Sequence, residues 1–247
     1  NCTFLFNYAG HNGGGLIAQD TTYSSYRRKS KYFVAIVNCT FMHNECRWNG
    51  GAAFAQATFI IIKNSYFGEN KAGKVGGVIY THTNVIIICK CLIANNSAAQ
   101  GGGGVMTDNF DNVLIVSCNI KHNSANYGAA FYMWGYKVKK LFLIASLLHN
   151  NTAKSIGSAI RYDGRIEYSS IFIYKSNFSA NSAQGKVVMV TKLESMEKRS
   201  TKEGSLFSLI HLKFTYIGKT FIKPKLNETS TLVAHIEGVT MNLINLT

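Results

Sequence analysis

Proline is almost absent from this sequence, since Pro224 is the only one among 247 residues. Proline cannot donate to the hydrogen bonds of an internal strand, so its scarcity is compatible with a chain made mainly of sheet. A run of about 18 uncharged apolar residues is also absent, which excludes a membrane-spanning helix within this segment. The sequence begins at Asn1 without Met or a signal-like apolar stretch, so we expect a mature piece or a fragment of a longer chain.

Acidic residues are scarce as well: 12 Asp and Glu stand against 26 Lys and Arg, for a formal net charge of +14. Such a charge usually attracts nucleic acid or an acidic glycan. The basic residues are spread along the chain without a nucleic-acid-binding motif, so we do not expect nucleic acid. Lys63, Lys90 and Lys175 recur at similar repeat positions, either as solvated lysines on a sheet surface or as a stripe for an anionic glycan.

What the sequence does contain is a repeat, seen best from Ile60 to Tyr80. A large apolar residue is followed three positions later by Asn, then by a small residue and a glycine pair, and successive copies lie 26 to 37 residues apart. The apolar residues are Phe4, Phe41, Phe67, Ile93, Ile120, Leu148 and Phe178. The asparagines, which we call the ladder asparagines, are Asn7, Asn44, Asn70, Asn96, Asn123, Asn151 and Asn181.

Each copy predicts short strands. The residues seven and five positions before the large apolar residue are apolar and mostly β-branched, as in Val34 and Ile36 or Ile86 and Ile88. A second apolar strand follows each glycine pair, and no connection is long enough for a crossover helix. We therefore predict an all-β fold, a right-handed parallel β-helix of roughly seven to nine coils, each about 26–30 residues long.

In such a solenoid, equivalent side chains of successive coils stack in ladders roughly 4.8 Å apart. A ladder asparagine would lie at a bend, bonded to the asparagines above and below it and to the turn backbone. We expect a single β-helix domain over residues 1–247, regular over 1–190 and degenerate over 191–247.

The pattern F-x-x-N-x-A followed by GGA or GGV resembles the repeat of chlamydial polymorphic outer-membrane proteins, which is also found in secreted proteins of the pectin-lyase-like β-helix superfamily. The resemblance covers roughly residues 1–190. It implies an extracellular or cell-surface β-helix that is often adhesive and has no common catalytic site. The chain departs from the pattern at Gly128, which comes one residue early, and in the seventh copy at Gly185, Lys186 and Val187.

The same superfamily raises an alternative, a polysaccharide lyase or glycoside hydrolase. Glycoside hydrolysis needs paired carboxylates, and the D-D and G-H-G patterns of the superfamily's glycosidases are absent here. Asp108 and Asp111 with Arg161 or Arg165 come nearest to an acid–base site, but we interpret both aspartates as residues of a polar turn. We therefore expect no catalytic residue, no metal and no cofactor.

Four of the six cysteines, Cys2, Cys39, Cys91 and Cys118, share one repeat position that Ser fills in other copies. This exchange indicates a site for a small buried side chain. Residues one coil apart would lie within disulfide range, so the sequence leaves the Cys2–Cys39 and Cys91–Cys118 disulfides open.

Seven Asn-x-Ser/Thr triplets favour a secretory route, although an Asn-rich repeat also produces such triplets by chance. The candidate glycosylation sites are Asn1, Asn38, Asn95, Asn150, Asn177, Asn227 and Asn245.

Residues 21–31 and 132–140 interrupt the repeat and are predicted to leave the coil as loops, and the charged stretch 193–204 is predicted to be a third. The second loop carries Tyr132, Trp134 and Tyr136, a candidate platform for a sugar ring. We predict a secreted or surface-displayed, non-enzymatic β-helix that acts as an adhesive or structural scaffold. Its expected partners are anionic glycans or cell-surface proteins.

Overall fold

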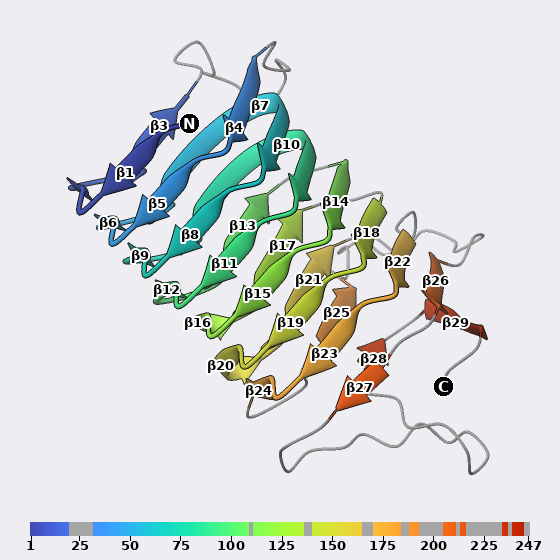
Figure 1. The fold of residues 1–247 in the computed structure, drawn as a ribbon. Helices are drawn as coiled ribbons and strands as arrows, with labels where there is room; N and C mark the ends of the chain where they lie inside the picture. Colours follow the sequence, from blue (N-terminus) through green and yellow to red (C-terminus); the bar gives the residue numbers. More distant parts are fainter. Residues whose placement is uncertain are drawn as a thin grey trace, which may run out of the picture.

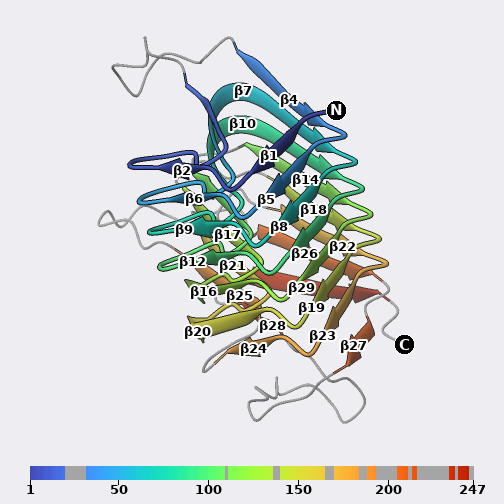
Figure 2. The same ribbon diagram turned by 60° about the vertical axis from the view of Figure 1, so that its left-hand side comes forward.

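The computed structural model describes residues 1–19, 32–108, 111–135, 140–164, 170–183 and 188–192, and beyond them the strands at 205–210, 213–215, 234–236 and 239–244. These residues contain strands and no helix, wound into a parallel β-solenoid (Figure 1). The predicted all-β solenoid class is therefore confirmed. Figure 2 shows the coils stacked one on another along a single axis. The predicted loops at 21–31 and 193–204 lie outside the described residues.

The solenoid has about five turns, so the predicted seven to nine coils were too many. Five turns run from Phe33 to Gly164, one for each of the strands β5, β8, β11, β15 and β19. The chain before them and after them adds strands to the sheets, but there the described residues are interrupted at 20–31, 165–169 and 184–187. The sequence count also included the repeats on either side of these five turns, because their repeat residues are still recognisable.

Three parallel sheets form the sides of the solenoid. The eight-stranded sheet comprises β1(Thr3–Leu5), β5(Thr40–Met42), β8(Tyr66–Gly68), β11(Leu92–Ala94), β15(Asn119–Lys121), β19(Leu147–His149), β23(Asn177–Ser179) and β27(Lys213–Thr215). The seven-stranded sheet comprises β2(Tyr8–Ala9), β6(Glu45–Cys46), β9(Lys71–Ala72), β12(Ser97–Ala98), β16(Ser124–Tyr127), β20(Thr152–Ile156) and β24(Ser182–Ala183).

The third sheet has fourteen strands in two halves, joined by the long strands β7(Ala53–Lys63) and β10(Ile79–Cys89), which belong to both. The first half adds β3(Leu16–Ala18), β13(Val105–Asp108), β17(Phe131–Gly135), β21(Ile160–Gly164), β25(Val188–Lys192) and β28(Ala234–Ile236). The second half adds β4(Phe33–Val37), β14(Asn112–Val116), β18(Lys140–Ile144), β22(Ser170–Tyr174), β26(Ser205–Ile210) and β29(Val239–Ile244). Figure 1 shows β7 and β10 curving from one half into the other.

The interior is filled by rows of equivalent apolar side chains. The Phe4 and Phe41 rings stack at 4.4 Å between centroids, and the Phe41 and Phe67 rings at 5.1 Å. Ile93 and Ile120 continue the row in register and are buried. Burial of such rows removes a continuous apolar surface from water, which is the main favourable contribution to folding.

The ladder asparagines form one hydrogen-bonded column beside this interior. The side-chain NH2 and the backbone N–H of Asn70 both donate to Oδ1 of Asn96, at 3.0 and 2.9 Å. The same NH2 group donates to the Phe41 carbonyl of the preceding coil at 3.0 Å. The side-chain bonds run unbroken from Asn7 to Asn181, and every member after Asn7 is buried. The column thus pairs buried amide groups that would otherwise be unsatisfied.

Each coil bends at residues with positive φ, a conformation that usually costs an L-residue about 1 kcal/mol or more. One set precedes the ladder asparagines, with φ between 51° and 59°: Phe6, His43, Glu69, Asn95, His122, Asn150 and Ala180. A second set lies three residues before the large apolar residues, with φ between 48° and 54°: Asn38, Asn64, Lys90, Ser117, Ala145 and Lys175. Glycine takes the third bend, at Gly13, Gly50, Gly76, Gly102, Gly128 and Gly157.

Replacing Asn96 with Ala should lower the free energy of unfolding by about 1–3 kcal/mol, because the buried Asn70 amide and the Phe67 carbonyl lose their partners. Asn7→Ala is the matched control, since Asn7 lies at the exposed end of the column. Asn7→Ala should therefore lower the free energy of unfolding by less than Asn96→Ala does. Denaturant titration of both variants measures the difference, and equal losses would contradict the importance of the buried column.

Replacing Ala145 with Gly should raise the free energy of unfolding by about 1 kcal/mol, because glycine adopts a φ of 48° without steric cost. The control is Ala99→Gly at another exposed position, where φ is not positive and glycine only adds entropy to the unfolded chain. Thermal unfolding should therefore shift upwards for Ala145→Gly and slightly downwards for Ala99→Gly. A downward shift for both would show that the bend carries no strain.

Candidate functional site

The first half of the fourteen-stranded sheet carries aromatic and charged side chains on its outer face. Alternate residues of its strands, such as Ile79 and Phe131, point into the core, so the residues between them point outward. Strand register aligns two outward rows across β10, β13, β17 and β21, which lie side by side in Figure 1. We define the aromatic–carboxylate cluster as Tyr80, His82, Asp108, Tyr127, Tyr132, Trp134, Arg161 and Asp163.

Asp108 is the acidic residue at one side of this cluster and is only 7% exposed. Its Oδ2 accepts a hydrogen bond from the Tyr80 hydroxyl at 3.2 Å and lies 3.0 Å from Nε2 of His82. Its Oδ1 is buried and has no hydrogen-bond partner in the part of the chain that the structure describes. A buried oxygen without a partner destabilises the fold by about 1–3 kcal/mol.

Asp163 is the second buried carboxylate, two coils away, and is 5% exposed. Its Oδ2 accepts from Nε of Arg161 at 2.6 Å and from the Tyr132 hydroxyl at 3.0 Å. The Arg161 guanidinium also lies over the Tyr127 ring at 4.3 Å and over the Tyr132 ring at 5.2 Å. Burial, and then the negative charge of Asp163, raise the pKa of the Tyr132 hydroxyl above its ordinary value. Tyr132 therefore stays a hydrogen-bond donor at neutral pH.

Trp134 lies between the two aspartates, in register with Asp108 on one side and Asp163 on the other. Trp134 and Tyr132 are both half-buried on the outer face of β17. The prediction of a loop over 132–140 was wrong for its first part, because Phe131 and Met133 pack into the core and continue the strand as far as 135. Tyr136 lies outside the described residues.

The interpretation of Asp108 as a turn residue was also wrong. Asp108 is the last residue of β13 and is aligned with His82 of β10, so it belongs to the sheet. Asp111 does lie at a bend, directly before β14, where its Oδ2 accepts from the Asn84 side chain at 2.9 Å. Arg161 meets Asp163 and not Asp108, while Arg165 lies outside the described residues.

Sequence reasoning missed Tyr80, His82 and Asp163 as members of a site, although a signal for them was present. Each copy has a short second strand after its glycine pair, and the cluster occupies alternate positions of that strand: YTH, MTD, YMW and RYD. Aligning the copies at these positions, and not only at the ladder asparagines, would have placed Asp108, Trp134 and Asp163 in one row. No alignment of the strands predicts which hydroxyl or imidazole reaches which oxygen.

The candidate glycosylation sites differ in accessibility. Asn1, Asn38 and Asn95 are exposed, and Asn38 and Asn95 lie at positive-φ bends. Asn150 and Asn177 are half-buried, and Oδ1 of Asn177 is itself buried. Asn227 and Asn245 lie outside the described residues. Glycosylation of these asparagines remains a prediction.

All six cysteines are free thiols, so neither candidate disulfide is formed. Cys91 and Cys118 are buried one coil apart, and each thiol donates to the carbonyl two residues before it, Cys91 to Cys89 and Cys118 to Val116, both at 3.3 Å. The adjacent Cys91 sulfur and then burial raise the pKa of the Cys118 thiol, while the same contact lowers the pKa of the Cys91 thiol. Burial also raises the pKa of the Cys46 thiol. The Cys46 and Cys118 thiols are therefore neutral packing groups.

The residues that the structure describes contain no group of three or more His, Cys, Asp or Glu side chains that could hold a metal ion. They also contain no helix with the length and apolar character needed to cross a membrane. What the cluster offers is four aromatic side chains, Tyr80, Tyr127, Tyr132 and Trp134, with two carboxylates, a guanidinium and an imidazole beside them. Such a surface can stack with a ring and exchange hydrogen bonds with hydroxyl groups.

Comparison with known proteins identifies one partial relative. Over 132 residues the chain is 29% identical to a transmembrane domain-containing protein of Dictyostelium discoideum. The match covers 53% of this chain and 8% of the relative, so the chain spans a small part of that protein's length. No protein-family model matches the chain, and no solved structure matches it.

Replacing Tyr132 with Phe should reduce the loss of stability at alkaline pH. Because the folded pKa of Tyr132 is raised, the folded state holds the hydroxyl proton that the unfolded chain releases above about pH 10. Its contribution to stability is therefore complete below that pH and is lost as pH rises. Urea titrations at about pH 9 and about pH 11 should show a smaller decline for Tyr132→Phe than for the wild type, and Tyr66→Phe, outside the cluster, is the control.

Proposed function

We propose that this chain is a secreted or cell-surface β-helix that acts as an adhesive or structural scaffold and binds carbohydrate through the aromatic–carboxylate cluster. The repeat supports placing it among right-handed β-helices of the pectin-lyase-like kind, with repeats like those of polymorphic outer-membrane proteins. The name of its Dictyostelium relative, which mentions a transmembrane domain, agrees with display at a cell surface. The exposed Asn-x-Ser/Thr triplets agree with passage through a secretory route.

One observation carries this proposal: Trp134 projects from the sheet between two buried carboxylates, with Tyr132 beside it. Sugars present apolar C–H faces that pack on aromatic rings, and hydroxyl groups that donate to carboxylate oxygens. Asp163 is held in place by Arg161 and Tyr132, so the polar edge of the platform is fixed before a ligand arrives. The column of asparagines keeps the strands that carry these residues in register.

The proposed partners are anionic glycans or glycosylated cell-surface proteins. The net charge of +14 attracts anionic glycans by long-range electrostatics, before any direct contact forms. Within the cluster, the charges of Arg161 and Asp163 compensate each other and Asp108 lies beside His82, so local recognition depends on ring stacking and hydroxyl groups. The net charge thus attracts the glycan, and the aromatic–carboxylate cluster recognises it.

Replacing Trp134 with Ala should weaken binding to a responsive glycan about tenfold, equivalent to about 1.4 kcal/mol. The matched control is Trp48→Ala, since Trp48 is exposed at a bend and contacts His11 and Lys74, away from the cluster. A glycan array followed by calorimetry on the best ligand would measure both variants. Equal weakening by both changes, or no binding to any glycan, would contradict the proposed site.

The same cluster also supports a second candidate, a glycoside hydrolase. Asp108 and Asp163 lie two coils apart in one row, so their α-carbons are separated by roughly 10 Å. Inverting glycosidases hold their two carboxyl groups about 6.5–9.5 Å apart, a separation that two side chains on such α-carbons can reach if they lean towards each other. Release of reducing sugar from polysaccharides, abolished by Asp108→Asn and by Asp163→Asn, would favour this enzyme. Binding without turnover favours the scaffold.

A further inference from the structure

The second half of the fourteen-stranded sheet has an outer face that the proposed function does not use. Its strands read FVAIV in β4, FIIIK at the end of β7, VIIIC at the end of β10, and KLFLI in β18. Strands that are apolar without alternation are typical of sheets covered on both faces. The inward residues, such as Ile60, Ile86 and Leu141, account for the core. The outward residues are equally apolar, yet they lie on the outside of the solenoid.

We define the apolar outer face by its outward residues: Phe33, Ala35, Val37, Phe59, Ile61, Val85, Ile87, Cys89, Leu114, Val116, Phe142, Ile144, Phe172 and Tyr174. One row of it, from Ala35 through Ile87 to Phe172, runs in register across β4, β7, β10, β14, β18 and β22, a distance of roughly 24 Å. Rings stack at both ends of the face, Phe33 on Phe59 at 5.5 Å and Phe142 on Phe172 at 4.9 Å.

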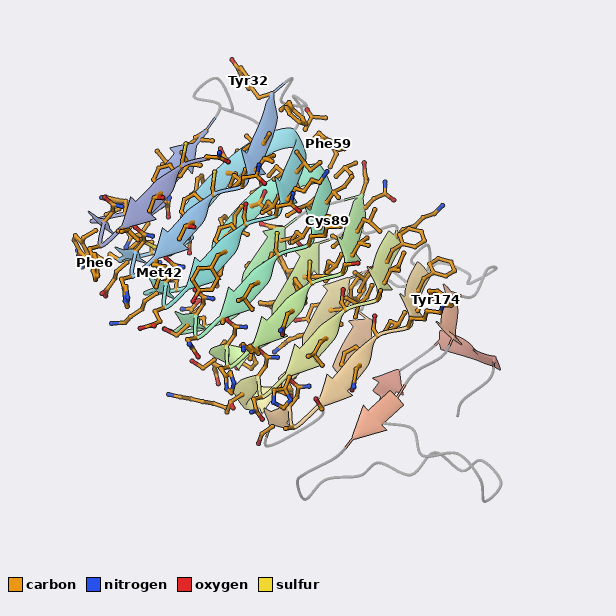
Figure 3. All side chains as sticks on the ribbon, viewed as in Figure 1. Phe6, Tyr32, Met42, Phe59, Cys89 and Tyr174 are labelled. Atoms are coloured by element: carbon orange, nitrogen blue, oxygen red, sulfur yellow. The ribbon has the colours of Figure 1, made fainter. Side chains whose placement is uncertain are left out.

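None of these side chains is buried. Phe33 is 60% exposed and Tyr174 is 37% exposed. In Figure 3, Phe59, Cys89 and Tyr174 follow one another along the same side of the solenoid. In the other half, two of the apolar outward residues, Phe54 and Met106, are nearly inaccessible. A contiguous exposed apolar surface of this kind is a sign of an interaction site.

The charged residues on and beside this face are nearly all positive. Lys63 and Lys140 lie on the face, and Lys90 and Lys175 lie at the bend next to it. All four are exposed, and none forms a salt bridge within the described residues. Among the described residues, the one acidic side chain near the face is Asp111, at the bend before β14, where it accepts from Asn84. The occupant of the face is therefore apolar at its centre and negatively charged around it.

We propose that the apolar outer face binds the surface of a membrane that contains anionic lipids. Its Ile, Leu and Phe side chains enter the boundary between headgroups and acyl chains, while the lysines contact the lipid phosphates and carboxylates. Tyr174 at the edge suits the same boundary, because its ring is apolar and its hydroxyl is polar. A second copy of this chain fits less well, since a symmetric pair would place this lysine-bearing face against itself.

Flotation with lipid vesicles tests the proposal on the full chain. The protein should float with vesicles of phosphatidylcholine and phosphatidylserine, and should float poorly with vesicles of phosphatidylcholine alone. Ile87→Thr keeps a β-branched residue in the strand but removes apolar surface, and Lys63→Glu reverses one charge on the face. Each should weaken vesicle binding several-fold. The matched controls are Leu92→Thr and Lys154→Glu, on the outer faces of the other two sheets, and both should bind as the wild type does.

Three outcomes would overturn the proposal. The first is no flotation with the anionic vesicles. The second is an equal loss of vesicle binding in Leu92→Thr and Lys154→Glu, which would show that net charge or non-specific hydrophobic contact causes the binding. The third is a dimer in solution that Ile87→Thr dissociates, which would identify the occupant as a second copy. None of these readouts depends on Trp134, so they do not test the carbohydrate proposal.

Discussion

The constraint on which the whole structure depends is that every coil repeats its predecessor at the spacing of hydrogen-bonded strands. The ladder asparagines make this constraint visible, since the amide of Asn70 is paired only if Asn96 stands directly beside it and the Phe41 carbonyl lies on the other side. A coil displaced by one residue would lose these bonds and would turn its apolar row towards water. Polar pairing and apolar burial therefore select the same register.

This arrangement divides the side chains into two groups with different tasks. Inward rows such as Ile60 and Ile86 are fixed by packing, and the bends are fixed by positive φ and by the asparagines. Outward positions are free of these demands and vary from coil to coil. The two halves of the largest sheet use that freedom differently: one carries buried carboxylates beside aromatic rings, and the other carries an apolar surface with lysines.

The sequence was sufficient for the fold class because the repeat multiplies a weak local signal. One Phe-x-x-Asn segment says little, but seven aligned copies specify parallel stacking, and the asparagine column lies where that alignment places it. The site was harder to predict. Asp108 looked like a turn residue, because the end of β13 cannot be seen from sequence spacing alone. The pairing of Arg161 with Asp163 depends on rotamers and on the neighbouring Tyr132 ring, which no periodicity encodes.

The bonds between coils run parallel to the axis of the solenoid, and this direction has a mechanical consequence. A tension that peels coils from the C-terminal side of the stack would break the Asn151–Asn181 bond before the next one towards the N-terminus, Asn123–Asn151. Extension would then proceed in steps of one repeat, each releasing a similar length of chain. A protein built in this way would extend gradually under load and would keep the coils that remain folded.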